Sequence, residues 1–287
     1  MNYIEGKTYQ EERALYNIKD TVVENCRFAG EEDGESFLKE CRNITVKNCY
    51  MDLRYPMWHV DGISVINCEM TGNCRAALWY DNGVYIENCR MNGIKALREC
   101  NGATLKGAVA NSPEFGWRCR DIKIRGGKIV SEYAFFGSAD ADIDGLEFSG
   151  KYSFQYTKNL KIANSAFKTK DAFWHAENVT VTDSVLDGEY LGWYSDGLTL
   201  VHCRIRGTQP LCYCKNLKLI DCTMENCDLS FEYSDVDADI KGAVLSVKNP
   251  KSGKIVADSY GEIILSDSKY KCEAEIEERN KNLRRAQ

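Results

Sequence analysis

The 287-residue chain has little of what would divide it, export it or carry it across a membrane. It holds four prolines and no low-complexity stretch, so no linker between domains is evident. No apolar run reaches the roughly 18 residues that a membrane-spanning helix needs, and residues 1–6 lack the basic and apolar segments of a secretion signal. The formal net charge of -6 gives no support for nucleic-acid binding. These absences predict a cytoplasmic protein that binds neither membranes nor nucleic acid.

What the chain does have is a short pattern that recurs along its whole length. In the copy from Asn43 to Met51, a turn residue precedes an apolar, a polar and an apolar residue, and a small residue and a large apolar residue follow. With the first apolar residue of each copy as a marker, Val84 to Leu217 are joined by seven successive intervals of 19 residues; the other intervals are 23, 19, 21, 21 and 25. The markers are Thr21, Ile44, Ile63, Val84, Ala103, Ile122, Ala141, Leu160, Val179, Leu198, Leu217 and Ala238, with a weaker one at Ile263.

A fixed period of this length predicts a solenoid. Apolar residues at the marker and two residues later predict one strand with a buried inner face, those five and seven residues after it predict a second, and an aromatic-rich stretch predicts a third. The residue before the marker is Asn, Asp or Gly in twelve successive copies, which indicates a left-handed bend. We therefore predict an all-β, single-domain parallel β-helix of about 12–13 coils at 21–271, with an N-terminal cap at 1–20 and a charged helix or tail at 272–287.

The 14 cysteines follow the same repeat. Most lie either five residues after a marker, as Cys49 and Cys68 do, or three residues before the next, as Cys100 and Cys119 do. Other copies place alanine, glycine or serine there, so we interpret these cysteines as small buried residues with free thiols. Thiols stacked along one line do not surround a tetrahedral ion, and we expect no metal site.

The unequal sides of the predicted coil resemble the right-handed parallel β-helix of the pectin-lyase-like group. More closely, the chain resembles a family of uncharacterised bacterial β-helix proteins that open with a Glu-Arg-Ala-Leu segment, here Glu12 to Leu15, and repeat short Asn-x-x-x-x-Asn units. The resemblance covers nearly the whole chain. It implies the fold and carries no established activity. We expect no cofactor.

The third stretch of each coil carries the candidate binding residues. If it is a strand, alternation places the residues 13 and 15 positions after the marker on the solvent side and those at 14 on the inner side. This direction stays open, because an inward Arg98 and Gln155 would be costly without partners. An exposed strip of aromatic and polar side chains is typical of a binding surface, and aromatic rings stack on sugar faces, so we predict an extended carbohydrate-like ligand. A stabilising aromatic ladder and a homo-oligomer interface are the alternatives. The candidate ligand-binding residues are Trp117, Arg118, Tyr156, Trp174, His175, Trp193, Tyr194 and Tyr213.

Catalysis stays open at this point. In the pectin-lyase-like group, hydrolases use clustered aspartates and lyases use arginine with aspartate-bound calcium, and Asp61-Gly62, Asp81-Asn82 and Asp196-Gly197 echo the former. Each pair falls at a turn of the repeat, where Asp, Asn and Gly are expected for structural reasons. A lyase or glycoside hydrolase acting on small oligosaccharides therefore remains an alternative. The catalytic candidates are Glu99 and Arg118, expected to pair as neighbours, and His175 as a general base.

Overall fold

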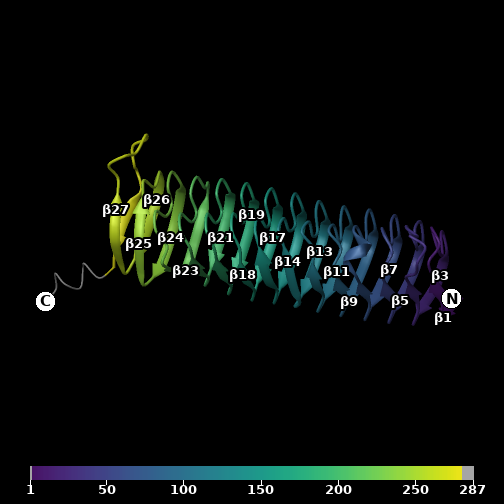
Figure 1. Cartoon of the computed structure of the whole chain (residues 1–287). Helices are drawn as coiled ribbons and strands as arrows, with labels where there is room; N and C mark the ends of the chain where they lie inside the picture. Colours follow the sequence, from purple (N-terminus) through teal and green to yellow (C-terminus); the bar gives the residue numbers. More distant parts are fainter. Residues whose placement is uncertain (1, 280–287) are drawn as a thin grey trace. The chain divides into compact units, whose positions relative to one another are not determined.

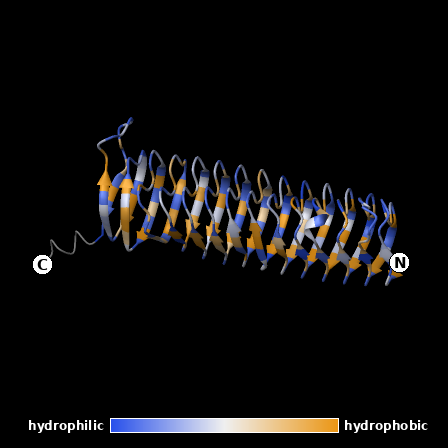
Figure 2. Ribbon diagram, viewed as in Figure 1, coloured by the Kyte–Doolittle hydropathy of each residue, from blue (hydrophilic) through white to orange (hydrophobic). Residues whose placement is uncertain are grey.

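The computed structural model describes residues 2–279 in two compact units, residues 1–147 and 148–287. Each unit is a stack of coils whose strands pair in parallel with the equivalent strands of the next coil (Figure 1). Figure 2 shows hydrophobic segments recurring on the strands of successive coils, with hydrophilic segments between them. The two units are described separately below.

The first side of the coils carries the longest series of strands. In the first unit these are β1 (Asn2–Glu5), β3 (Lys19–Glu24), β5 (Arg42–Lys47), β7 (Asp61–Ile66), β9 (Asn82–Glu87), β11 (Asn101–Lys106), β13 (Arg120–Arg125) and β15 (Ala139–Asp144). In the second unit they are β17 (Lys158–Ala163), β19 (Glu177–Thr182), β21 (Asp196–Val201), β23 (Leu217–Glu225), β24 (Asp235–Lys241), β26 (Ser252–Ala257) and β28 (Glu275–Glu278).

The second side carries shorter strands. They are β2 (Thr8–Tyr9), β4 (Arg27–Phe28), β6 (Tyr50–Met51), β8 (Glu69–Met70), β10 (Arg90–Met91), β12 (Val109–Asn111), β14 (Lys128–Ser131), β16 (Glu147–Gly150), β18 (Ala166–Lys168), β20 (Val185–Asp187) and β22 (Arg204–Arg206). A separate two-stranded sheet joins β25 (Ala243–Lys248) to β27 (Ser259–Ile264). Within the described residues the helical structure is one 3-10 turn, η1 (Gly72–Cys74).

The register of the paired strands confirms that the 19-residue repeat sets which residues face each other in successive coils. Ile44 in β5 faces Ile63 in β7, and Val179 in β19 faces Leu198 in β21, so markers meet markers. The residue two positions after the marker is also buried, as Val46 is in β5. The all-β parallel solenoid with a 19-residue period is therefore as predicted, because alternating apolar residues bury one face of each strand against the inside of the coil.

Both ends differ from the prediction. Residues 1–20 were expected to be a cap, but β1 and β2 pair in register with β3 and β4 and form a further coil. At the other end a charged helix or tail was expected over 272–287, but Ile276 of β28 faces Ile255 of β26, and Glu277 Oε1 lies 2.8 Å from Lys254 Nζ. These strands raise the count to about fifteen coils. Residues 280–287 lie outside the described part of the chain.

The third side is a series of tight bends, and this changes which side chains face outward. Asp171, Phe173 and His175 all have positive φ, between 53° and 60°, and the same alternation occurs in neighbouring coils. Because every second residue is left-handed, side chains do not alternate in and out as they do along a strand. Phe173 is fully buried, Trp174 is half-buried and His175 is exposed. Position 13 is therefore inward and position 14 half-buried, against simple strand alternation, and position 15 is exposed.

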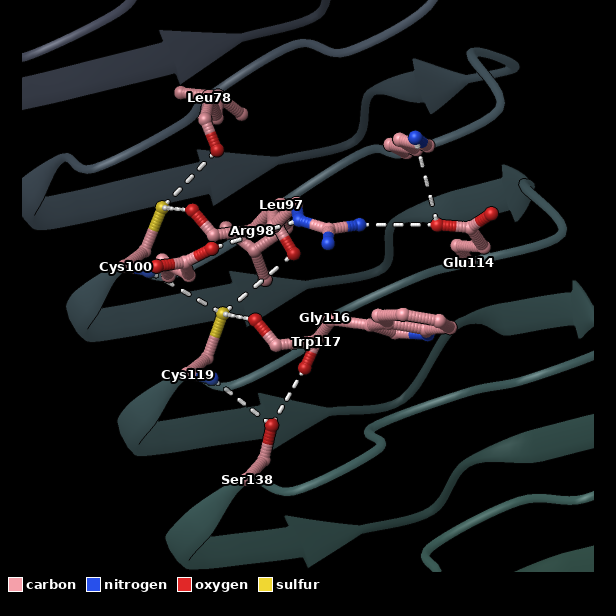
Figure 3. A network of polar contacts seen from close by, with 11 residues as sticks. Leu78, Leu97, Arg98, Cys100, Glu114, Gly116, Trp117, Cys119 and Ser138 are labelled. Atoms are coloured by element: carbon pink, nitrogen blue, oxygen red, sulfur yellow. Dashed lines mark hydrogen bonds and ion pairs between the residues drawn. The ribbon is translucent and has the colours of Figure 1, made fainter.

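The cysteines are buried free thiols, as predicted, with the half-buried Cys272 as the exception. The structure adds the reason for their placement at corners. The Cys119 Sγ accepts a hydrogen bond from the Cys100 backbone N–H at 3.4 Å, and in the next coil the Ser138 Oγ accepts one from the Cys119 N–H at 2.9 Å (Figure 3). The Cys119 thiol in turn donates to the Trp117 carbonyl. Cysteine and serine are thus interchangeable acceptors for corner N–H groups.

Candidate aromatic face

The second unit carries a row of stacked rings on its third side. The ring centroids of Tyr156 and His175 lie 4.9 Å apart, those of His175 and Tyr194 5.1 Å, and those of Tyr194 and Tyr213 4.8 Å, with interplanar angles of 7° to 12°. Tyr156 is 50% exposed and Tyr194 is 46% exposed. The row continues through a tilted contact of Tyr213 with Tyr233. One residue per coil therefore builds a continuous aromatic column.

The stacking decides which part of each ring a ligand can reach. Because Tyr194 lies between His175 and Tyr213, its two faces are covered and only its edge and hydroxyl remain for solvent. The expected stacking of sugars on ring faces is therefore not available inside this row. What the row can offer is hydrogen bonding by phenol hydroxyls and an imidazole, which both donate and accept.

The tryptophans form a second, less exposed column beside the first. Trp174 and Trp193 stack at 5.3 Å with an interplanar angle of 4°. Their indole N–H groups donate to the backbone carbonyls of Tyr190 and Gln209, both at 2.7 Å. Since both donors are used internally, these tryptophans anchor the bends and leave hydrogen bonding with a ligand to the outer column.

Charged groups flank one end of the row. The Tyr213 hydroxyl donates to Glu232 Oε2 at 3.2 Å, and Glu232 Oε1 lies 3.2 Å from Lys248 Nζ. Partial burial, together with the neighbouring Glu232 carboxylate, raises the pKa of Tyr213 to about 12. Tyr213 therefore stays a neutral hydroxyl throughout the physiological range.

In the first unit, the column equivalent to the tryptophan column is built around the guanidinium of Arg98. The Arg98 guanidinium lies 5.1 Å from the ring centroid of Trp79 and 4.8 Å from that of Trp117, and its Nη1 lies 2.9 Å from Glu114 Oε2 (Figure 3). Arginine thus replaces an aromatic ring between two indoles. The indole of Trp117 is half-buried and donates to the Tyr133 carbonyl, so this candidate serves the column as a packing residue.

A family model matches residues 2–277. The chain belongs to the family described as Protein of unknown function (DUF3737). No curated protein sequence matches it. Among solved structures, two match that are of QnrB1, a plasmid-mediated fluoroquinolone resistance protein, and they share 14% and 15% sequence identity with this chain. Each match covers 82% of this chain, and the matches cover 91% and 90% of the QnrB1 chains. The TM-score is 0.23 for both. The A-module of the Azotobacter vinelandii mannuronan C-5 epimerase AlgE4 shares 10% identity, with 96% and 90% covered and a TM-score of 0.26. Likeness at this level transfers no function to the DUF3737 chain.

The catalytic candidates of this DUF3737 chain are not brought together as expected. Glu99 and Arg118 were predicted to pair, but Glu99 Oε1 lies 3.6 Å from Arg98 Nε, and no ion pair links it to Arg118 within residues 2–279. Arg118 is exposed. His175 lies between two tyrosine rings. The cation that Glu99 contacts is thus Arg98, the preceding residue in the chain.

Two of the turn aspartates have the structural roles that the sequence indicated. Asp61 Oδ2 lies 3.7 Å from Arg42 Nε on the surface, and Asp196 accepts a hydrogen bond from Asn216 at 2.8 Å. Among residues 2–279, no three histidine, cysteine, aspartate or glutamate side chains are placed to hold a metal ion. The search for a helix long and apolar enough to cross a membrane also found none in that part of the DUF3737 chain.

Asp81 is the residue whose environment sequence reasoning missed. It was interpreted as a turn residue, but it is fully buried and occupies the corner position that Cys100 fills in the next coil. Its Oδ1 accepts the Val60 N–H at 2.7 Å, while its Oδ2 has no partner in the described residues. Burial raises the pKa of Asp81 well above its ordinary value. The sequence signal for this burial was the position of Asp81 three residues before the marker, because other coils have a cysteine or serine there.

Proposed function

We propose that the second unit binds an extended, carbohydrate-like ligand along the outer edge of its aromatic column. The observation that carries this proposal is the row of Tyr156, His175, Tyr194 and Tyr213, which repeats at 4.8 to 5.1 Å. A linear ligand lying along the row would meet one hydroxyl or imidazole per coil. A chain of sugar units, which carries hydroxyl groups at regular intervals, suits such a periodic set of donors and acceptors.

The proposed recognition differs from ring-on-sugar stacking. The faces of His175 and Tyr194 are covered by their neighbours, so affinity comes from hydrogen bonds at ring edges. Each such bond contributes about 0.5–1.5 kcal/mol net, and several in register add up to a useful affinity. A preformed stack also reduces the conformational entropy that binding would otherwise cost.

The test is a titration of a glycan panel followed by the intrinsic fluorescence of the protein, which Trp174 and Trp193 report from the adjoining column. For a glycan that binds, the substitutions Tyr156→Phe and Tyr194→Phe keep the ring and remove the hydroxyl. We expect each to raise Kd by roughly three- to tenfold, and Tyr194→Phe to do so with no change in thermal stability.

The matched control is Tyr16→Phe, which makes the same chemical change at an exposed tyrosine of the first unit. It should leave Kd unchanged. If no glycan on the panel binds, or if glycans bind equally well to the Tyr194→Phe and wild-type proteins, the proposal is wrong.

A purely structural role is the second candidate, and the stacking itself favours it. Rings in register at 4.8 to 5.3 Å stabilise neighbouring coils whether or not a ligand is present. This candidate includes a homo-oligomer whose interface is the aromatic column. Light scattering at high concentration distinguishes the two forms: a monomer removes the interface, and an oligomer that Tyr194→Ala dissociates supports it. The predicted cytoplasmic location is checked separately by cell fractionation.

A further inference from the structure

The first unit contains a cavity where the repeat departs from 19 residues. The interval from Thr21 to Ile44 is four residues longer than the period, and that from Ile63 to Val84 is two residues longer. The extra residues form loops on either side of a regular coil, and together they line a cavity of about 420 Å³. Insertions in a solenoid repeat emerge as loops on one face, which is often the binding face. The volume is in the range of sites for small molecules.

Both walls of the cavity are fixed to the coil between them. Residues 30–33 form one wall, and the Arg54 guanidinium secures it through contacts of 2.9 Å from Nε and Nη2 to the Asp33 carboxylate. Residues 72–75 belong to the other wall, where Asp52 Oδ1 accepts hydrogen bonds from Thr71 and, at 3.1 Å, from Asn73. The cavity is therefore a preformed feature of the three coils.

The charges left over in the cavity are mostly negative. The Arg54 guanidinium forms ion pairs with the carboxylates of Asp33 and Glu35. Glu31 and Glu32 line the cavity without a hydrogen bond or ion pair among the described residues, and Asp52 has only neutral donors as partners. Against these three carboxylates stands the guanidinium of Arg75, which also has no acidic partner there. Counted over the lining residues alone, four carboxylates against two guanidinium groups give the cavity a net charge of -2.

The carboxylates are spread over the cavity. No three acidic, histidine or cysteine side chains of residues 2–279 come close enough together to hold one metal ion. A compact divalent cation would therefore contact too few oxygens. A ligand with two separate positive charges fits both the total charge and its distribution.

We propose that this cavity binds a small organic dication, a linear diamine. One ammonium group would lie against Glu31 and Glu32 and the other against the Asp52 carboxylate, with Leu53 and Ile94 beside the aliphatic segment of the ligand. The proposal lies beyond the carbohydrate proposal and does not depend on it, since it concerns the first unit alone.

The test is isothermal titration calorimetry of the full chain with 1,4-diaminobutane at low salt. We expect saturable binding with one site, which weakens as salt is added because the contacts are ionic. The double substitution Glu31→Gln/Glu32→Gln should raise Kd by roughly tenfold, and Arg75→Gln should lower Kd because it removes the opposing charge. These exposed positions should leave the melting temperature unchanged.

The control is Glu262→Gln, which removes one exposed carboxylate from the second unit. It should not change Kd. The proposal is overturned if diaminobutane gives no saturable heat, if Glu262→Gln weakens binding as much as the double substitution does, or if calcium saturates the cavity and diaminobutane does not.

Discussion

Single residues at the corners of the coils solve a hydrogen-bonding problem. A backbone N–H at a corner can miss the strand ladder, and an unpaired buried N–H costs free energy. Cys68 Sγ accepts the N–H of Cys49 at 3.4 Å, and Ser184 Oγ accepts that of Ser165 at 3.0 Å. Each side chain also donates to the carbonyl two residues earlier. Burial raises the pKa of the Cys41 and Cys214 thiols to about 11, so both stay protonated donors at neutral pH.

Asp81 performs the same task at a cost that depends on pH. Its pKa is raised in the folded state, so folding favours the protonated form. The stability of the wild type should therefore fall as pH rises from about 4, the ordinary aspartate value, towards the folded pKa. Asp81→Ser keeps an acceptor for the Val60 N–H. We expect it to increase the free energy of unfolding by about 1–3 kcal/mol at pH 7, measured by urea denaturation.

The matched control for Asp81→Ser is Asp61→Ser at an exposed position. It should change the free energy of unfolding by less than about 0.5 kcal/mol. Equal pH profiles for the wild type and Asp81→Ser between pH 4 and pH 8 would contradict a protonated, buried Asp81. The environment of Asp81 includes the Cys100 thiol in the following coil, which also raises its pKa.

At the scale of elements, the bends of the third side are as regular as the strands. Left-handed residues recur at fixed positions of each coil, and most of them are not glycine. Phe173 and Leu211 are examples with φ of 60° and 62°. Each such residue costs about 1–2 kcal/mol relative to a right-handed conformation, and burial of the large side chain offsets that cost.

This explains why two left-handed glycines should respond differently to the same substitution. Gly192 occupies the position of Phe173, and the nearest atoms to an added Cβ would be the flexible ends of Leu198 and Leu211 at 3.0 Å. In β26, an added Cβ on Gly253 would lie 2.1 Å from the Val236 carbonyl oxygen. We expect Gly192→Ala to destabilise by about 1–2 kcal/mol, the cost of a left-handed alanine, and Gly253→Ala, where the clash adds to that cost, to destabilise by at least about 3 kcal/mol. Thermal denaturation of both variants checks this, and equal effects would refute it.

At the scale of the whole molecule, each coil contacts mainly its neighbours, so stability is close to a sum of coil and interface terms. The strand β7 pairs with both β5 and β9, whereas β1 pairs with β3 alone among the described residues. We expect amides of β1 to exchange with solvent markedly faster than those of β7, measured by hydrogen exchange with mass spectrometry. Equal protection would mean that a second chain covers the edge of β1.

The amino-acid sequence by itself determined the period, the inner faces of the first two strands, and the burial of the cysteines. These depend on the local alternation of residues such as Ile44 and Val46, which a linear pattern reveals. The end strands β1 and β28 were not predicted from the sequence, because their patterns are weak and pairing with the neighbouring coils holds them in place. The candidate site was predicted in part: position 15 is exposed, but the direction of positions 13 and 14 was not foreseen.

Only the tertiary structure decided the rest. The alternating left-handed backbone around Phe173 depends on pairing between coils, and it turned an expected strand into bends with covered ring faces. The burial of Asp81 and the cavity beside Arg54 depend on which side chains of separate coils meet. A 19-residue repeat places residues in register along the stack, whereas packing across coils sets their direction, their partners and their charge.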